Sequence, residues 1–207
     1  MAKTKLLDIS IREFGAKGLD GASTRKIASA AGTAMSSITY HFGGKEGLYL
    51  AAAEDIAERM GEVEDGIDFS CEDDPAVARQ LIKTLLSRLI DKVTASKNEG
   101  LFIVREQMEP TAAFDRLWSG AMESMWGRAS RLISIASGVS DMERCRIVAF
   151  TLFGQAIATR ATRAGLERMM QGTLDDPALL DRVREVILAN ADAILDQLAT
   201  HAERDPA

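Results

Sequence analysis

Residues 39–48 read TYHFGGKEGL and close a run of short predicted helices near the start of the 207-residue chain. Apolar residues recur at helical spacing over about residues 3–17, which predicts an amphipathic helix ended by Gly18. A second helix is expected to start at Ser23-Thr24, where a hydroxyl can accept from the free amides of the first turn. Gly32 then allows a tight turn before a third helix. This order of helices predicts a helix-turn-helix.

The third helix, expected over about residues 34–41, has an outer face of short or planar hydrogen-bonding groups with no carboxylate. The members of this face are Ser36, Ser37, Thr39, Tyr40 and His41. Such groups can bond to base edges and phosphates, whereas carboxylates are repelled by them. Lys45 follows at the start of a fourth helix, where its ammonium and the helix amino end both attract a phosphate. The pattern predicts a DNA-recognition helix, with Tyr40 and His41 at the protein surface.

Charge is unevenly distributed along the chain. The whole sequence has a formal net charge of −6, but residues 1–47 hold seven basic and four acidic side chains and therefore carry +3. The remaining residues carry −9. A basic head on an acidic body favours an oriented approach to a polyanion. A solvated helical surface with chance asymmetry is the simpler alternative, and it does not account for the accompanying turn pattern.

Several positions within residues 6–49 form a family pattern. They are Phe14, Gly18, Thr24, Ile27-Ala28, Ala31-Gly32, Tyr40-His41-Phe42 and Lys45-Glu46-Gly47-Leu48. This stretch resembles the amino-terminal domain of the TetR family of transcriptional repressors. The chain has Thr33-Ala34 where the family usually has an apolar residue and then Ser, and Thr33 is a candidate for the missing capping role. Carried over by position, the resemblance implies DNA contacts from Thr24, Arg25, Ser36, Ser37, Thr39, Tyr40, His41 and Lys45.

The rest of the chain predicts an all-α protein, because it has only four prolines and few β-branched runs. Residues 1–47 are expected to form the helix-turn-helix domain, and residues 48–207 a larger helical domain for ligand binding and dimerisation. No apolar signal segment or membrane-length stretch is present, so a cytoplasmic location is expected. Cys71 and Cys145 lack metal-ligand spacing, which favours inert thiols over a disulfide or a metal site.

The body also resembles a branch of the family. Residues 104–115 and 150–157 are similar to the regulatory domain of CecR-type members, which implies a cavity for a small-molecule effector. Aromatic and thioether side chains recur at spacings of three or four from Phe114 to Trp126, and such side chains make adaptable pocket walls. The predicted pocket residues are Phe102, Arg105, Glu109, Phe114, Trp118, Met122, Trp126 and Gln155. The alternative is that the apolar members are core and the polar members are exposed or paired structurally.

The last two predicted helices carry apolar residues on more than one side. A helix that is apolar on two sides needs two partners, its own core and something else. A second copy of the chain is the favoured partner, and a wholly intramolecular core is the alternative. The predicted dimer interface contains Phe150, Gly154, Ile157, Ala158, Ala161, Val183, Ile187, Ile194 and Leu198.

Two short motifs resemble those of enzymes, but each lacks the companion residues that its chemistry needs. Residues 23–26 match the Ser-x-x-Lys pattern, but the other motifs of penicillin-binding enzymes are missing. Gly43-Gly44-Lys45 lacks the hydroxyl and spacing of a phosphate-binding loop. The sequence therefore predicts no catalytic site and no cofactor, but a ligand-responsive regulator that binds a pseudo-palindromic operator as a homodimer, with repression as the family expectation. A helical scaffold without DNA binding is the alternative, and it leaves the carboxylate-free face unexplained.

Overall fold

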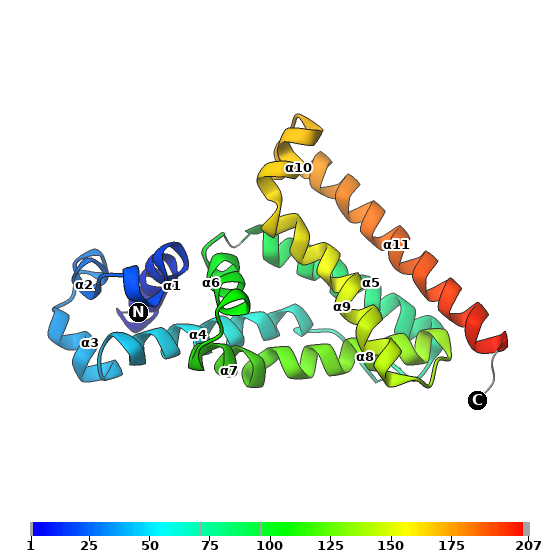
Figure 1. The fold of residues 1–207 in the computed structure, drawn as a ribbon, viewed down its shortest axis with the longest axis horizontal. Helices are drawn as coiled ribbons and strands as arrows, with labels where there is room; N and C mark the ends of the chain where they lie inside the picture. Colours follow the sequence, from blue (N-terminus) through cyan, green and yellow to red (C-terminus); the bar gives the residue numbers. More distant parts are fainter. Residues whose placement is uncertain (1, 71, 96, 205–207) are drawn as a thin grey trace. The chain divides into compact units, whose positions relative to one another are not determined.

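The computed structural model describes residues 2–70, 72–95 and 97–204, and within them all regular secondary structure is helical (Figure 1). The predicted all-α class is confirmed. The chain divides into two compact units, one of Met1–Glu62 with Ser96–Glu123 and one of Val63–Ala95 with Ser124–Ala207. This division rests on contacts within the chain, and the motif-based boundary after residue 47 stays a prediction.

The first unit contains the helix-turn-helix and two later helices. Its elements are α1 (Ala2–Gly21), α2 (Thr24–Ala31), α3 (Met35–Phe42), α4 (Lys45–Gly61), α6 (Lys97–Met108), α7 (Ala112–Leu117) and the π-helix η2 (Trp118–Met122). Figure 1 shows α6 beside α1, and α1 contacts both α4 and α6. The fully buried core includes Phe14, Ile27, Ile38, Leu48 and Ile56. The periodic apolar residues of the amino-terminal helices thus lie in one core, and α6, from later in the chain, packs against α1 in the same unit.

Two glycines let α1 approach α6 closely. A Cβ at Gly15 would lie 2.6 Å from the backbone oxygen of Asn98, so no larger residue fits without a shift. Gly18 has φ 71° and interrupts the helical backbone, and the helix resumes to Gly21. A Cβ at Gly18 would meet the Arg105 side chain at 3.2 Å. The helix end predicted at Gly18 is therefore a kink inside a longer helix.

Local caps define the helix-turn-helix. Ser23 is the N-cap of α2, and its hydroxyl accepts from the amide of Lys26 at 3.4 Å. Gly32 takes the left-handed conformation, with φ 72°, and ends α2. The capping role considered for Thr33 is wrong, because Ala34 is the N-cap of α3 and makes no side-chain cap bond. Thr33 Oγ1 instead donates to Ser37 Oγ at 3.0 Å.

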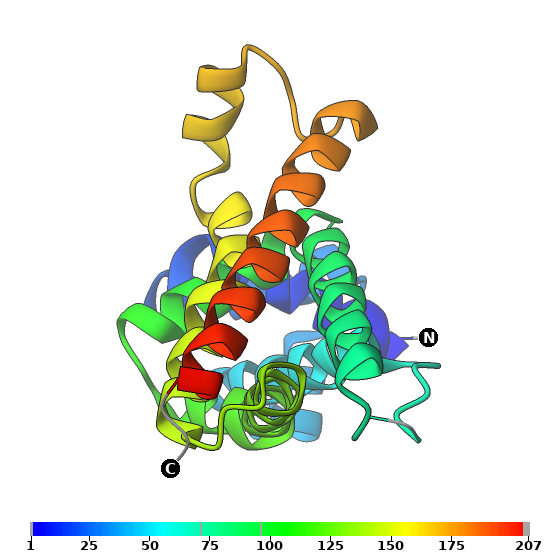
Figure 2. The same ribbon diagram turned by 90° about the vertical axis from the view of Figure 1, so that its right-hand side faces the viewer.

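The second unit is a separate helical core. It contains α5 (Pro75–Ala95), α8 (Glu123–Ser137, which begins at the unit boundary), α9 (Met142–Ala161), α10 (Arg163–Met170) and α11 (Pro177–Arg204), and the short 3-10 helix η1 (Glu62–Glu64) leads into it. Helices α5, α9 and α11 contact one another, as Figure 2 shows from the side of α11. Leu86, Leu132, Leu152 and Leu195 are completely buried in their shared core. No helix in the described ranges is long and apolar enough to cross a membrane.

The stretch from Ala112 to Ser137 is helical throughout but changes type. The π-helix η2 lies between the α-helices α7 and α8. Thr111 does cap this region, and its hydroxyl accepts from the amide of Ala113 at 3.1 Å.

Candidate nucleic-acid interface

Helix α3 presents a polar and aromatic outer face. The side chain of Tyr40 is 84% exposed, and Ser36, Thr39 and His41 are also exposed. Ser37 is half-buried because its hydroxyl accepts from Thr33. The predicted surface position of Tyr40 and His41 is confirmed, whereas DNA contact by these residues stays a prediction.

The aromatic side chains at the end of α3 stack in sequence. The rings of Tyr40 and His41 lie edge to face with centroids 4.9 Å apart, and His41 lies edge to face with Phe42 at 6.4 Å. Phe42 is half-buried, so this series of rings runs from the protein outward. These edge-to-face contacts leave the phenol and the imidazole at the protein surface.

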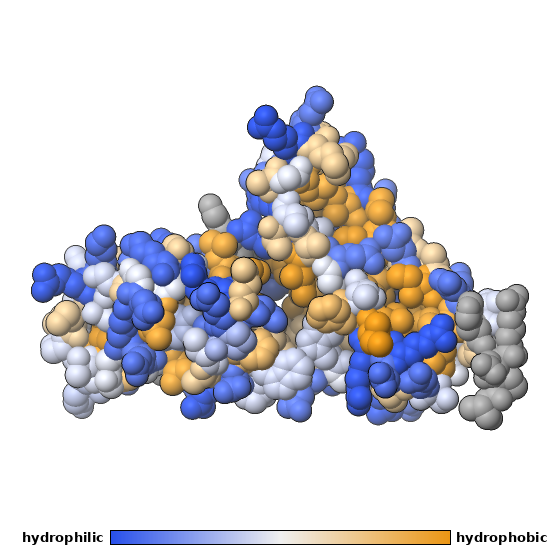
Figure 3. Space-filling view, viewed as in Figure 1, coloured by the Kyte–Doolittle hydropathy of each residue, from blue (hydrophilic) through white to orange (hydrophobic). Residues whose placement is uncertain are grey.

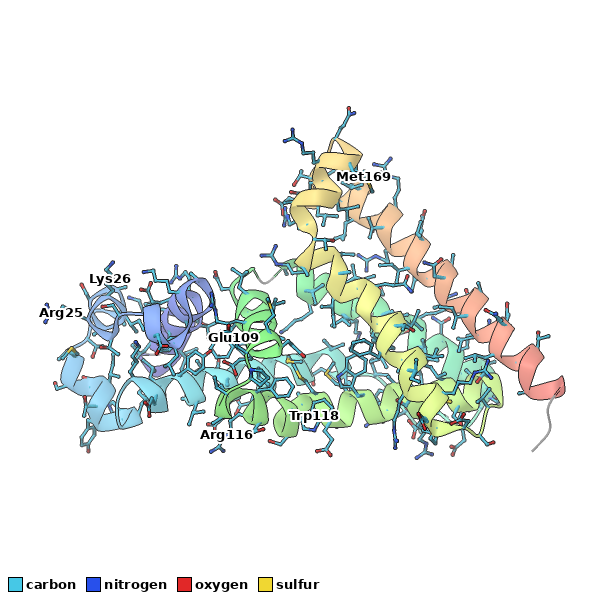
Figure 4. All side chains as sticks on the ribbon, viewed as in Figure 1. Arg25, Lys26, Glu109, Arg116, Trp118 and Met169 are labelled. Carbon is cyan, nitrogen blue, oxygen red and sulfur yellow. The ribbon has the colours of Figure 1, made fainter. Side chains whose placement is uncertain are left out.

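Helix α2 adds positive charge to the surface of the helix-turn-helix. Thr24 is half-buried at its first turn, while Arg25 and Lys26 are exposed and point outward in Figure 4. Lys26 lies close enough to Glu13 to help lower the pKa of that carboxyl, after the larger effect of the hydrogen bond from Lys17. Lys26 was not among the predicted contacts, although its position next to Arg25 on a short helix was the available signal. Exposed basic groups of this kind suit contacts to phosphate.

Lys45 is tied to the end of α1. Its Nζ donates to the backbone oxygen of Asp20 at 2.9 Å, and the residue is half-buried. An ammonium has three donors, so one bond to Asp20 leaves two for an anion. The first-turn amides of α4 also lie at this point. Lys45 can therefore hold α4 against α1 and still face a phosphate.

The predicted effector pocket divides between the two compact units. Phe102, Arg105, Glu109, Phe114, Trp118 and Met122 lie in the first unit, and Trp126 and Gln155 lie in the second. Phe102 is fully buried, and its ring lies 4.6 Å from that of Tyr49. Trp118 is 41% exposed, with its ring 6.2 Å from Phe114. These positions agree with core or surface roles as well as with a pocket, and the pocket stays a prediction.

The second-unit members have structural partners. Trp126 packs on Phe150 and Phe153, with ring centroids 6.0 and 6.3 Å away. Gln155 Oε1 accepts from Asn190 Nδ2 at 2.8 Å. A shallow hollow of about 170 Å³ lies elsewhere, lined by Asp8, Ile11, Arg12, Arg59, Asn98 and Glu99. None of the predicted pocket residues lines that hollow.

The outer face of α9 is apolar and open. Phe150 is 69% exposed and Ile157 is 38% exposed, and a Cβ at Gly154 would meet nothing within 4 Å. Ala158 and Ala161 are exposed on the same helix. Figure 3 shows hydrophobic residues gathered over α9 and α11. The α9 part of the predicted interface is thus accessible.

The α11 part of that interface needs correction. Ile187 and Leu198 are each 5% exposed and belong to the core of their own unit, so their assignment to a dimer interface is wrong. Val183 and Ile194 are half-buried and pack against the same core. Val186, 61% exposed, is the large apolar residue that α11 turns to the surface.

Two family models match the chain. Residues 6–52 match a model described as bacterial regulatory proteins of the tetR family. Residues 77–198, more than half of the chain, match the C-terminal domain of the HTH-type transcriptional dual regulator CecR. Both resemblances seen in the sequence are therefore confirmed.

Relatives and solved structures agree with these models. The dual regulator CecR of Shigella flexneri is 31% identical over 209 residues, which span 96% of this chain and 93% of that protein. The repressor AcnR of Corynebacterium glutamicum is 39% identical over 62 residues, or 30% of this chain and 33% of that protein. The transcriptional regulator SCO4942 from Streptomyces coelicolor has a TM-score of 0.68 at 17% identity, covering 94% of this chain and 98% of that one. A tetR-family regulator from Shewanella sp. PV-4 has a TM-score of 0.66 at 22% identity, covering 92% and 96%. These structural likenesses concern the fold.

Proposed function

Because the chain belongs to the TetR family and carries a CecR-type C-terminal domain, we propose that it binds a pseudo-palindromic operator as a homodimer. Family membership makes it a DNA-binding transcriptional regulator rather than an enzyme. The observation that carries the finer proposal is the exposed, carboxylate-free face of α3, together with the exposed Arg25 and Lys26 of α2. The helical-scaffold alternative gives this face no role.

The proposed dimer presents two copies of α3 to successive major grooves. A two-fold dimer then sets half-sites about one helical turn apart, on the order of 10 base pairs. The accessible apolar face of α9 supports a second copy as the partner, because a large exposed apolar surface marks an interaction site. We define this α9 interface by Phe150, Gly154, Ile157, Ala158 and Ala161.

Regulation is proposed to follow from a small molecule bound in the helical body. An effector that favours a different separation of the two copies of α3 weakens DNA binding, and by linkage DNA weakens effector binding by the same factor. Repression by promoter occlusion is the proposed default. The relative aligned along nearly its full length is named a dual regulator, so activation at other sites is compatible with this family. The protein is proposed to act in the cytoplasm, where the bacterial chromosome lies.

Selection of bound duplexes from a random library tests the function directly. Sequencing should reveal a two-fold symmetric consensus with half-sites about one turn apart. Binding without any consensus would contradict operator recognition, and no binding at all would favour the scaffold alternative. The genes beside the genomic matches would then indicate the class of effector to titrate.

Lys45→Ala is expected to weaken binding to operator and random DNA alike. If Lys45 neutralises a phosphate, the slope of log affinity against log salt should fall in magnitude by roughly 1 per subunit. Fluorescence anisotropy at several salt concentrations measures both quantities.

Lys45→Arg is the matched control, because it keeps the charge and can still donate toward Asp20. It should restore the salt slope. An unchanged slope for a folded Lys45→Ala protein would show that Lys45 serves only to hold α4 against α1.

A further inference from the structure

A carboxylate is buried in the first unit, away from the proposed DNA contacts. Glu106, in the last turns of α6, is only 1% exposed. Its Oε1 accepts from the Tyr49 hydroxyl at 2.6 Å. Its Oε2 accepts from the amide of Thr111 at 3.0 Å and from the Thr111 hydroxyl at 2.9 Å. Three donors from two other segments therefore converge on one carboxylate.

These hydrogen bonds explain how the carboxylate is tolerated in a core. A buried charge is costly unless hydrogen bonds satisfy it, and bonds to a charged acceptor are stronger than neutral ones. Thr111 is also the N-cap of α7, so the carboxylate lies close to the positive end of that helix. Burial raises the pKa of Tyr49, and its hydrogen bond to Glu106 raises it further, which keeps the phenol a donor. An apolar side chain of similar size could fill this space, but it could not accept the directional hydrogen bonds from Tyr49 and Thr111.

Tyr49 connects this network to α1 and α4. The residue is 2% exposed on the second turn of α4. Its ring lies edge to face with Phe14 of α1 at 4.8 Å and tilted against Phe102 of α6 at 4.6 Å. The ring of Tyr49 is thus held between α1 and α6, and the hydrogen bond from its hydroxyl to Glu106 restricts its position further.

The same end of α4 supports the recognition helix. Helix α3 packs against α4, and only Gly43 and Gly44 separate them in the chain, so a displacement of the start of α4 also displaces α3. Lys45 holds this start to Asp20 of α1, and Tyr49 holds the next turn to Glu106 of α6. Two bonds about one turn apart along α4 therefore set its direction relative to α1 and α6.

We propose that Glu106 is a positioning residue for DNA recognition, which holds α4, and through it α3, in the binding orientation by way of Tyr49. This proposal rests on the proposed operator binding. It makes the turn between α6 and α7 a structural part of the DNA-binding unit, although that turn lies some sixty residues beyond the helix-turn-helix in the sequence.

The test compares full-length Tyr49→Phe, Glu106→Gln and the double variant on the selected operator and on a random duplex. Tyr49→Phe keeps the ring contacts and removes only the hydroxyl. Gln at residue 106 can accept from Tyr49, but its amide cannot satisfy both donors of Thr111. Each single variant should lose operator affinity on the order of tenfold, similar to loss of one recognition contact. The double variant should lose little more, because both changes disrupt one network.

Random-duplex affinity and its salt slope separate positioning from a general loss of structure. Neither variant removes a positive charge, so both quantities should match wild type. Thr84→Val is the matched control, because it removes a helix hydroxyl that donates to the backbone oxygen of Gln80 in the other unit, and it should leave operator affinity unchanged.

Wild-type operator affinity in a folded Tyr49→Phe protein would overturn the proposal, even if Glu106→Gln fails to fold. Equal losses on operator and random DNA would also overturn it, because they would indicate fewer folded molecules. If wild type itself selects no consensus, operator recognition fails and the positioning role falls with it, which is a distinct result.

Discussion

Tyr40→Ala is expected to weaken operator binding by about 1–3 kcal/mol per subunit, the usual cost of a lost specific contact. Both subunits of the proposed dimer carry the change, so the total loss is about 2–6 kcal/mol and the affinity should fall by roughly 30-fold to 10,000-fold. Stability should change by less than about 0.5 kcal/mol, because the side chain is 84% exposed and fills no core space. Anisotropy titrations and thermal melting measure the two effects separately.

Tyr40→Phe distinguishes the hydroxyl from the ring. The variant keeps the edge-to-face contact with His41, so any loss of affinity reports the phenol oxygen alone. A folded Tyr40→Ala protein with normal operator affinity would show that α3 is not read through this residue. A large fall in melting temperature would instead contradict the exposed position on which the prediction rests.

The helix-turn-helix was predictable because its signals are local. Ser23 caps α2 and Gly32 ends it in a left-handed conformation, and both residues act within one turn of their own position. The periodic Ile27 and Ile38 are buried as their spacing requires, while Tyr40 lies on the opposite side of α3. A single sequence contains all of this information.

Contacts between distant segments were not predictable in the same way. The bond from Lys45 to Asp20 spans 25 positions, and that from Tyr49 to Glu106 spans 57. Nothing in the spacing of an acidic residue in α6 shows that it is buried rather than exposed. The tight approach of Gly15 to Asn98 is likewise visible only when α1 and α6 are side by side.

The predicted aromatic stripe runs through a π-helix. A spacing of three or four residues keeps side chains on one face only while the helix stays α-helical. Residues 118–122 form a π-helix, whose wider turn shifts the later side chains around the axis. The ring of Trp118 lies near that of Phe114, whereas Trp126 packs on Phe150 and Phe153 of its own unit.

The two sides of α11 illustrate a related limit. Apolar residues occur on both sides of this helix, and their spacing alone does not indicate which side faces the core. Ile187, Leu195 and Leu198 are buried in the chain itself, while Val186 is exposed. The proposed dimer interface therefore rests mainly on α9, where Phe150 and Ile157 remain accessible.

Ile157→Asp is expected to abolish the dimer and with it operator binding. A two-fold interface places the two copies of the new carboxylate near each other and away from water. An unpaired buried charge costs several kcal/mol, and loss of one partner of a buried ion pair, about 3–5 kcal/mol, gives the scale. The result should be monomer or aggregate. Residues 1–47 are unchanged, but one copy of α3 reads only half a site. Sedimentation at micromolar concentration, together with operator titration, measures both losses.

Leu101→Asp is the matched control for this change, because Leu101 is 40% exposed against 38% for Ile157 and lies on α6 in the other unit. It introduces the same charge at similar exposure, so it should leave the dimer intact. An Ile157→Asp protein that stays dimeric and binds operator would remove α9 from the interface. A wild-type chain that sediments as a monomer near 22.4 kDa would remove the dimer, and recognition of two successive grooves would fail because no second copy of α3 is present.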